Sequence, residues 1–190
     1  VLPPTRSLVE QARKLRQGRW AGRCVQGPPL ASELSRKTVG IIGCGHIGRE
    51  VARLAELFEM HTRAIRSDHS RAGLEALLEA SDFLVISCPL TSRTRGLIGA
   101  AEFAKMRPAA SLINVARGEV VDESALFAAL RDKQIRSAAI DVWYQYPKDG
   151  QPRLPTNFPF EHLDEAIVTP PPSDRPHHAR PHTRPDTNPD

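Results

Sequence analysis

The segment TVGIIGCGHIG, residues 38–48, is the clearest indication of the fold in this 190-residue chain. Its first five residues form a short, largely apolar run, which is typical of a buried strand. The next six residues form the pattern G-x-G-x-x-G, and apolar residues then recur at helical spacing. A strand, a glycine turn and a helix in this order are typical of the phosphate-binding turn of a dinucleotide fold. The predicted apolar stripe of the helix consists of Ile47, Val51, Leu54, Ala55 and Phe58.

Each glycine of the motif has its own physical task. We expect Gly43 to permit the tight turn, Gly45 to let a pyrophosphate approach the backbone, and Gly48 to let the helix pack closely on the strand. The amides near His46 and Ile47 would lie at the helix N-terminus, where unpaired N–H groups and the helix dipole favour phosphate. This position requires only a backbone donor, so we assign His46 no catalytic role. The alternative is a glycine-rich turn without a ligand.

Strand and helix patterns alternate through residues 1–169, which we assign to one dinucleotide-binding domain. Near-continuous apolar strands that alternate with helices predict the α/β class. We expect a Rossmann-type, doubly wound parallel sheet in a three-layer αβα arrangement. Further strands are predicted at 61–66, 82–87, 111–114, 137–141 and 166–169. Further helices are predicted from Ser7-x-x-Glu10, at Leu74–Leu78, at Phe103–Met106 before Pro108, and after a cap at Asp122.

The end of the second predicted strand bears on the choice of cofactor. A fold that selects NAD usually places an acid there to bind the ribose 2′-hydroxyl, whereas this chain has Arg66. A guanidinium cannot accept that hydroxyl proton, but it pairs well with a 2′-phosphate. Arg63 and Arg71 add positive charge nearby. We therefore favour NADP over NAD. Asp68 would restore an acid after a shift of two residues, and a solvated arginine face is a further alternative.

Composition excludes several classes of protein. The chain is 25% charged and 40% hydrophobic, which is ordinary for a globular domain. Its net charge of +4 is too small by itself to predict nucleic-acid binding, and no aromatic stacking platform accompanies the arginines. Three cysteines at positions 24, 44 and 88 make no disulfide framework, which favours a reducing compartment such as the cytoplasm. We expect no metal site, no membrane segment and no signal peptide.

The two ends of the chain are unusual. Residues 170–190 contain seven of the seventeen prolines and almost no apolar side chains, so we predict a disordered, proline-rich tail. Its mixture of Pro, His, Arg and Thr is also what an out-of-frame reading of a GC-rich gene would yield. The chain begins with Val1, so we expect a processed chain or a fragment.

Three later segments carry a family resemblance. They are SDFLVISCPLTSRTRGLIG (81–99), MRPAASLINVARGEVVDESALFAAL (106–130) and AAIDVW (138–143). With the glycine motif, they resemble the NAD(P)-binding domain of the D-isomer-specific 2-hydroxyacid dehydrogenases, of the glyoxylate/hydroxypyruvate reductase type, over about residues 5–170. The family transfers a hydride between the nicotinamide C4 and the carbonyl carbon of a 2-oxoacid.

The resemblance implies roles for residues at the predicted strand ends. Cys88 and Pro89 would lie where the third strand meets the cofactor. Val115 and Ala116 would line the nicotinamide side, and Asp141 would match the acid near the carboxamide; these complete a cofactor set with Gly43, Gly45, His46, Ile47, Gly48 and Arg66. Arg117 matches the catalytic arginine, which would hold the substrate carboxylate and polarise the keto oxygen. For Arg117 the alternative is a structural ion pair, and for Cys88 a small buried side chain.

The chain departs from the family at two catalytic positions. Tyr146 stands at the position of the glutamate that orients the catalytic histidine, and Pro171 stands at the position of the histidine itself. A tyrosine carries no charge at neutral pH, and a proline has no proton to give. The split substrate domain of the family is also not recognisable. We therefore expect the chain to be incomplete as a catalyst, and which 2-oxoacid it serves is left open.

Two functions compete on these grounds. One is the cofactor-binding half of an oxidoreductase, and the other is a non-catalytic dinucleotide-binding module or a remnant of a truncated or frameshifted gene. Family members form two-fold dimers through the leading helix and the loop that follows it. Leu8, Leu15 and Trp20 lie in that stretch, so we expect a homodimer, with Trp20 packing on its own sheet as the alternative.

Overall fold

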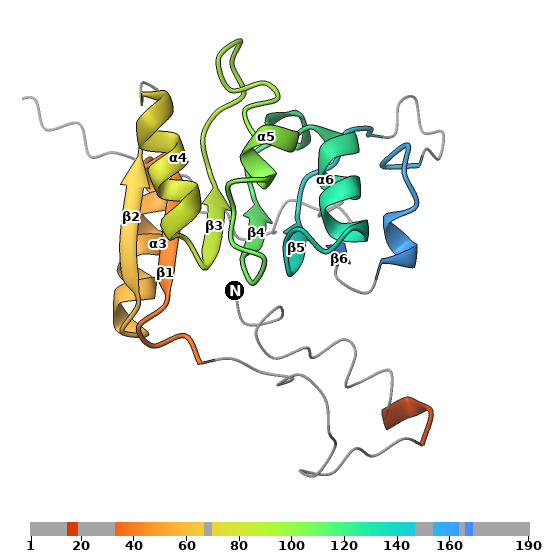
Figure 1. Cartoon of the computed structure of the whole chain (residues 1–190), viewed down its shortest axis with the longest axis horizontal. Coiled ribbons are helices and arrows are strands. Elements are labelled where there is room, and N and C mark those ends of the chain that lie inside the picture. The colour runs from red at the N-terminus through yellow and green to blue at the C-terminus, as the bar shows by residue number, and fades with distance from the viewer. Residues whose placement is uncertain (1–14, 19–32, 67–69, 147–153, 164–165, 169–190) are drawn as a thin grey trace, which may run out of the picture.

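The computed structural model of the chain describes residues 15–18, 33–66, 70–146, 154–163 and 166–168 (Figure 1). Within them, parallel strands form one six-stranded sheet in the order β2-β1-β3-β4-β5-β6. The strands are β1 (Thr38–Ile42), β2 (His61–Ile65), β3 (Phe83–Ile86), β4 (Ser111–Asn114), β5 (Ser137–Ile140) and β6 (Ala166–Val168). The helices are α3 (His46–Leu57), α4 (Arg71–Ala80), α5 (Ala100–Phe103) and α6 (Glu123–Arg131), with 3₁₀ turns η1 (Gly118–Val120) and η2 (Phe160–His162).

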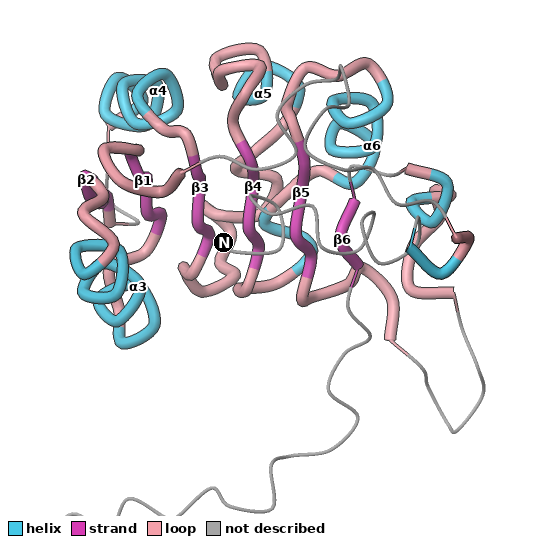
Figure 2. Tube along the Cα trace, turned by 90° about the horizontal axis from the view of Figure 1, so that it is seen from below, coloured by secondary structure: helices cyan, strands magenta, loops and turns pink. Residues whose placement is uncertain are grey.

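Helices cover both faces of the sheet. Figure 2 shows α3 on one face and α4, α5 and α6 on the other. Because side chains alternate along a strand, each face contributes to its own apolar core. Leu84, Leu112 and Ile140 belong to the larger core beside α4 and α6, whereas Val85 and Ile113 belong to the smaller core beside α3. The predicted α/β class, with a Rossmann-type parallel sheet in three layers, is confirmed.

The strand order reverses next to β1. β2 pairs with one edge of β1 and β3 with the other, so the connections that leave β1 and β3 turn to opposite sides of the sheet. Open α/β sheets bind their ligands in the crevice outside the carboxyl ends of the strands at such a reversal. The glycine motif begins at Gly43, directly after β1, and Cys88 follows β3. Both segments therefore lie at the reversal point.

Two helices begin at side-chain caps. The Ser70 hydroxyl accepts a hydrogen bond from the Gly73 N–H at 3.1 Å, at the start of α4. The Asp122 carboxylate accepts from the Ala125 N–H at 2.8 Å and from the Ser124 hydroxyl at 2.6 Å, at the start of α6. These donors hold the pKa of Asp122 below its usual value, the serine hydroxyl having the larger effect. The cap predicted at Asp122 is confirmed.

The predicted strands and helices agree with the structure to within one or two residues at most ends. The short helix is the least accurate, since α5 ends at Phe103 and Met106 lies in the turn that follows. The stripe predicted for α3 is correct in part. Ala55 is buried and Val51 packs against the core, whereas Ile47, Leu54 and Phe58 are 55%, 43% and 50% exposed. The close approach at Gly48 turns the helix so that only one side of the predicted stripe meets the sheet.

Some predictions fall outside the described residues. They are the first helix apart from residues 15–18, the disorder of residues 170–190, and the end of the last strand at Thr169. The boundary between residues 169 and 170 therefore stays a prediction. Among the described residues, none of the helices has the length and apolarity needed to cross a membrane.

Candidate functional site

The turn after β1 depends on Gly43. Its φ of +99° lies in a region that other residues rarely adopt. A Cβ at this position would also stand 2.6 Å from both the N and the Cα of Cys88. The backbone of the turn thus packs directly against the backbone that leaves β3. The Gly43 N–H donates to the Ile65 carbonyl at 2.9 Å, which ties the turn to the end of β2 as well.

Gly48 brings α3 against this turn. A Cβ on Gly48 would meet the Gly43 carbonyl oxygen at 2.1 Å and the Ser87 Oγ at 3.0 Å. The Ser87 hydroxyl donates to the same carbonyl oxygen at 2.7 Å. The Gly43 carbonyl is therefore enclosed between the helix and the residue that follows β3. Ser87 was not among the sequence-predicted site residues, because a serine at a strand end carries no motif of its own.

Gly45 differs from the other two glycines because the space around it is open. Nothing lies within 4 Å of the Cβ that a side chain would add there. Gly45 precedes α3, and His46 and Ile47 are exposed in its first turn. The first amides of a helix have no carbonyl partner within it, so this end of α3 offers N–H groups to a ligand. No acidic residue occupies the first turn of α3, so nothing there would repel an anion.

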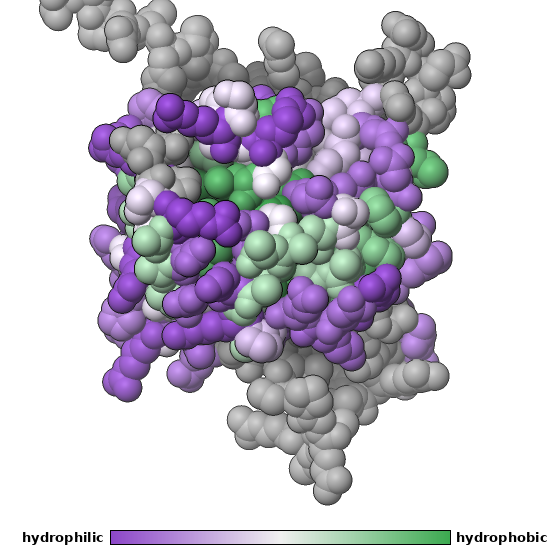
Figure 3. Space-filling model, turned by 45° about the horizontal axis from the view of Figure 1, so that its top comes forward, coloured by the Kyte–Doolittle hydropathy of each residue, from purple (hydrophilic) through white to green (hydrophobic). Residues whose placement is uncertain are grey.

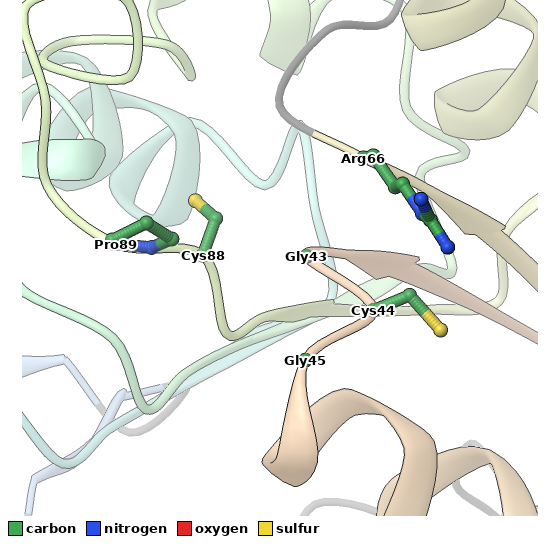
Figure 4. A pocket seen from close by; sticks show the side chains of 6 residues that line it. All are labelled: Gly43, Cys44, Gly45, Arg66, Cys88 and Pro89. Carbon is green, nitrogen blue, oxygen red and sulfur yellow. The ribbon is translucent and has the colours of Figure 1, made fainter.

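A recess of about 200 Å³ opens beside the turn and is shown in Figure 4. It is lined by Gly43, Cys44, Gly45, Arg66, Cys88 and Pro89. Three separate strand ends therefore contribute to one hollow. Figure 4 shows the side chains of Cys44 and Arg66 on the same side of the turn, while Cys88 points away from them. Of the lining residues, only Cys44 was not predicted individually, although it is the first variable position of the glycine motif.

The electrostatics of the recess come mainly from Arg66, which is exposed. Arg71, another arginine predicted nearby, pairs with Glu75 and Glu102, each at 3.1 Å, and does not line the recess. Cys88 is 2% exposed, and burial raises the pKa of its thiol. Its thiol is therefore protonated at neutral pH and behaves as a small apolar wall of the recess.

A second group of predicted residues follows β4 and β5. The Val115 N–H donates to the Ile86 carbonyl at 3.1 Å, and the Asp141 N–H donates to the Asn114 carbonyl at 3.1 Å. Val115 and Asp141 therefore continue the same carboxyl edge of the sheet as the recess, although they do not line it. In Figure 3 apolar residues lie in a hollow among hydrophilic ones on the side that comes forward.

Arg117 is presented by a tightly held turn. The Asn114 side chain is 2% exposed; its nitrogen donates to the Arg117 carbonyl and its oxygen accepts from the Ala116 N–H, both at 3.0 Å. Gly118 follows, where a Cβ would stand 2.6 Å from the Trp143 carbonyl oxygen. Arg117 is exposed between buried neighbours, and its Nη1 donates to the Ala116 carbonyl at 2.7 Å. The turn thus directs a single cation out of the sheet edge.

Tyr146, which stands where the family has a glutamate, forms a local hydrogen bond. The Tyr146 hydroxyl accepts from the Trp143 N–H at 3.2 Å, and Tyr146 is 43% exposed. Tyr146 thereby closes the loop after β5 onto itself. Pro171, the other departure, lies outside the described residues. Within the described part of the chain, no three His, Cys, Asp or Glu residues are grouped as metal ligands.

Comparison with known proteins gives a consistent result. Residues 1–171 match the model of the NAD-binding domain of D-isomer specific 2-hydroxyacid dehydrogenases. The chain is 37% identical over 182 residues to a glyoxylate/hydroxypyruvate reductase B from Citrobacter koseri, a match that covers 90% of this chain and 54% of that protein. The chain therefore spans about half the length of the relatives that it matches.

Solved structures match the fold over a share of the two chains similar to that of the sequence match. An acyclic imino acid reductase in complex with NADPH and D-Arg matches with a TM-score of 0.74 and 28% identity, over 88% of this chain and 53% of that one. D-lactate dehydrogenase with NAD⁺ from Lactobacillus jensenii matches with a TM-score of 0.71 and 27% identity, over 88% and 54%. A nicotinamide cofactor is common to both complexes, although the two differ in the 2′-phosphate.

Proposed function

The chain belongs to the D-isomer specific 2-hydroxyacid dehydrogenases, and we propose that it binds NADP(H) as the cofactor half of an oxidoreductase acting on 2-oxo or 2-hydroxy acids. The supporting observation is the recess at the strand-order reversal, which joins the glycine turn to Arg66. The glycine turn matches the pyrophosphate of a dinucleotide, and Arg66 matches a phosphate on its ribose.

The residues around the turn suit a pyrophosphate. The open space at Gly45 leaves room for phosphate oxygens against the backbone, and the exposed start of α3 supplies N–H donors. The Gly43 carbonyl oxygen, which would repel an anion, accepts a hydrogen bond from the Ser87 hydroxyl. We assign the pyrophosphate to Gly45, His46 and Ile47, with Gly43 and Gly48 shaping the turn.

The remaining predicted residues are assigned around this core. Cys88 and Pro89 would flank the middle of the dinucleotide, Val115 and Ala116 the nicotinamide side, and Asp141 its carboxamide. The bound cofactor would supply or accept the hydride. Arg117 would pair with the carboxylate of a small 2-oxoacid and polarise its keto oxygen, since a guanidinium offers several donors in one plane. Its fixed turn at Asn114 supports this role, because a positioned cation loses little entropy on binding.

Arg66 supports a preference for NADP(H) over NAD(H). It follows β2 directly, lines the recess, and brings a positive charge where an acid would be needed for the 2′-hydroxyl. A charge-assisted hydrogen bond is worth about 1.5–3 kcal/mol, which is roughly a 10- to 100-fold change in affinity.

A fluorescence titration with NADPH and NADH tests this proposal. We expect tighter binding of NADPH, and we expect Arg66→Ala to weaken NADPH binding roughly 10- to 100-fold while changing NADH binding little. Arg63→Ala is the matched control, since Arg63 is an exposed arginine on β2, the strand that ends just before Arg66, and lines no part of the recess. Absence of binding to a folded wild-type chain would refute the cofactor site, and tighter binding of NADH would refute the role of Arg66.

A second candidate is a dinucleotide-binding module without turnover. Tyr146 and Pro171 favour it, because a proline has no proton to give to the keto oxygen and a neutral tyrosine cannot stabilise an imidazolium as a carboxylate does. We propose that the chain by itself binds the cofactor without turning over. Loss of NADPH absorbance with glyoxylate, hydroxypyruvate or pyruvate would contradict this, and its absence beside tight NADPH binding would support it.

We also propose that the chain forms a homodimer through the stretch that contains Leu8, Leu15 and Trp20. Leu15, the member of this stretch that the structure describes, is 57% exposed. Light scattering coupled to size exclusion tests the dimer, with Trp20→Ala expected to shift the mass toward a monomer. A monomeric wild-type chain would refute it.

A further inference from the structure

We propose that Ser87 is a positioning residue for the cofactor, because its hydroxyl holds the Gly43–Cys44 peptide in the orientation that a pyrophosphate requires. This inference rests on the proposed function. Ser87 directly follows β3, whereas the glycine motif follows β1, so the two segments are distant in sequence. It differs from the roles assigned above, since Ser87 would not touch the cofactor.

The geometry around Gly43 carries the proposal. The Ser87 Oγ lies 2.7 Å from the Gly43 carbonyl oxygen, a full-strength distance for a hydroxyl donor. The same Oγ lies 3.5 Å from the Ile42 carbonyl oxygen, so Gly43 is its main acceptor. A peptide is planar, and among the described residues no peptide bond is cis. In a trans peptide the N–H lies in the same plane as the carbonyl and points in the opposite direction, so the Cys44 N–H points away from Ser87.

The flexibility of the turn explains why it needs such a contact. Gly43 and Gly45 flank Cys44, and glycine tolerates both signs of φ. The backbone torsions of these two glycines therefore do not by themselves restrict the Gly43–Cys44 peptide to one orientation. The rotated peptide would direct its carbonyl oxygen, and no longer its N–H, toward the recess, where it would repel phosphate oxygens. The Ser87 hydroxyl stabilises one of the two orientations before the ligand arrives.

The hydroxyl is not needed for the sheet itself. The Ser87 backbone N–H already donates to the Ile42 carbonyl at 2.9 Å, which completes the pairing of β3 with β1. The apolar core is likewise made by neighbouring residues such as Ile86 and Cys88. What the hydroxyl adds is the hold on Gly43, so its removal should affect the turn more than the fold.

The test compares three variants with the wild-type chain. Ser87→Ala removes the donor and Ser87→Thr retains it. Ser111→Ala is the matched control. The Ser111 hydroxyl is also buried and is hydrogen-bonded to the Ser137 hydroxyl at 2.8 Å. It lies at the start of β4, however, and so at the amino-terminal ends of the strands, away from the turn. Affinities for NADPH, NADH and adenosine 2′-monophosphate are measured by calorimetry or NMR titration, with the melting temperature of each variant.

We expect Ser87→Ala to weaken NADPH and NADH alike by about three- to tenfold, the effect of one neutral hydrogen bond. Adenosine 2′-monophosphate has no pyrophosphate, so its affinity should not change. Ser87→Thr and Ser111→Ala should bind NADPH as the wild-type chain does. A general structural role for Ser87 would instead weaken all three ligands together.

Three results would overturn the inference: unchanged NADPH affinity in Ser87→Ala, an equal loss for adenosine 2′-monophosphate, or an equal loss in Ser111→Ala. Equal weakening by Ser87→Ala and Ser87→Thr would also count against the hydroxyl. Failure of the proposed function looks different, because the wild-type chain itself would then bind no dinucleotide.

Discussion

Two glycines of the same motif predict opposite effects when each is replaced by alanine. Gly48→Ala should cost stability, because its new Cβ would stand 2.1 Å from the backbone carbonyl oxygen of Gly43. Gly45→Ala should cost cofactor affinity and little stability, because its new Cβ meets nothing within 4 Å. The two changes add the same methyl group three residues apart. Any difference between them therefore reports the surroundings of each position.

The cost of Gly48→Ala follows from three contributions. Overpacking against a rigid backbone atom costs about 1–3 kcal/mol. Displacing the Gly43 carbonyl weakens its hydrogen bond with Ser87, at about 0.5–1.5 kcal/mol. Alanine regains about 0.5–1 kcal/mol through its better helix propensity. The net loss is about 0.5–4 kcal/mol, and each kcal/mol lowers the melting temperature of a domain of this size by roughly 2–4 °C.

For Gly45→Ala the stability contributions nearly cancel. Alanine is a poorer N-cap than glycine by about 0.5 kcal/mol, and it lowers the entropy of the unfolded chain by a similar amount. The melting temperature should therefore change by at most about 2 °C. The methyl group, however, occupies the space assigned to the pyrophosphate. We expect NADPH affinity to fall at least about tenfold, since this corresponds to only about 1.4 kcal/mol.

Thermal unfolding followed by circular dichroism, and NADPH titration at a temperature where each variant is folded, measure both effects. A Gly48→Ala chain that melts with the wild type would refute the close packing of α3 on the turn. A Gly45→Ala chain that binds NADPH like the wild type would refute the location of the pyrophosphate. Equal losses of both properties in both variants would mean that the motif acts only as a structural unit.

Other consequences can be checked with the same protein. The pKa of Asp122 is lowered on folding, so its charge stabilises the chain above about pH 4, the unfolded value, and this stabilisation is lost as the pH falls through the lower folded value. In urea unfolding, Asp122→Asn, which retains a cap, should differ from wild type at pH 7, and the difference should shrink steadily as the pH is lowered below about 4. Cys44 should react with iodoacetamide faster than Cys88, whose pKa burial raises, and NADPH should protect Cys44; mass spectrometry of tryptic peptides would show a reversed order if this is wrong. Glu123→Ala should lower the unfolding free energy by about 1–3 kcal/mol, because its carboxylate accepts the N–H and side-chain amide of Asn157 at 2.9 and 3.0 Å; an unchanged urea midpoint would contradict this.

Much of the fold can be predicted from short stretches of sequence. The run from Thr38 to Ile42 is apolar and brief, and the glycines that follow occupy positions that only a strand, a turn and a helix satisfy together. The cap at Asp122 is equally local, because its acceptor and donors lie within three residues. Such features were predicted correctly because their causes act between near neighbours in the chain.

The orientation of α3 could not be predicted from local sequence alone. Periodicity alone would bury the whole apolar stripe, Ile47, Val51, Leu54, Ala55 and Phe58. The structure buries Ala55 with Gly48 and leaves Ile47, Leu54 and Phe58 exposed, because the helix approaches the Gly43 carbonyl and Ser87 on the side of Gly48. Steric fit of the helix against the turn and the end of β3 outweighs the average hydrophobicity of a face.

The sequence by itself determined the α/β class, the family and the presence of a dinucleotide turn, because these depend on local spacing and on residue types. Tertiary structure decided how the site is assembled. Arg66 lines the recess while Arg71 is paired with Glu102, and Ser87 reaches back to a carbonyl 44 residues earlier in the chain. Hydrogen bonds and ion pairs of this range require particular strand neighbours, and those neighbours exist only once β3 has added to the free edge of β1.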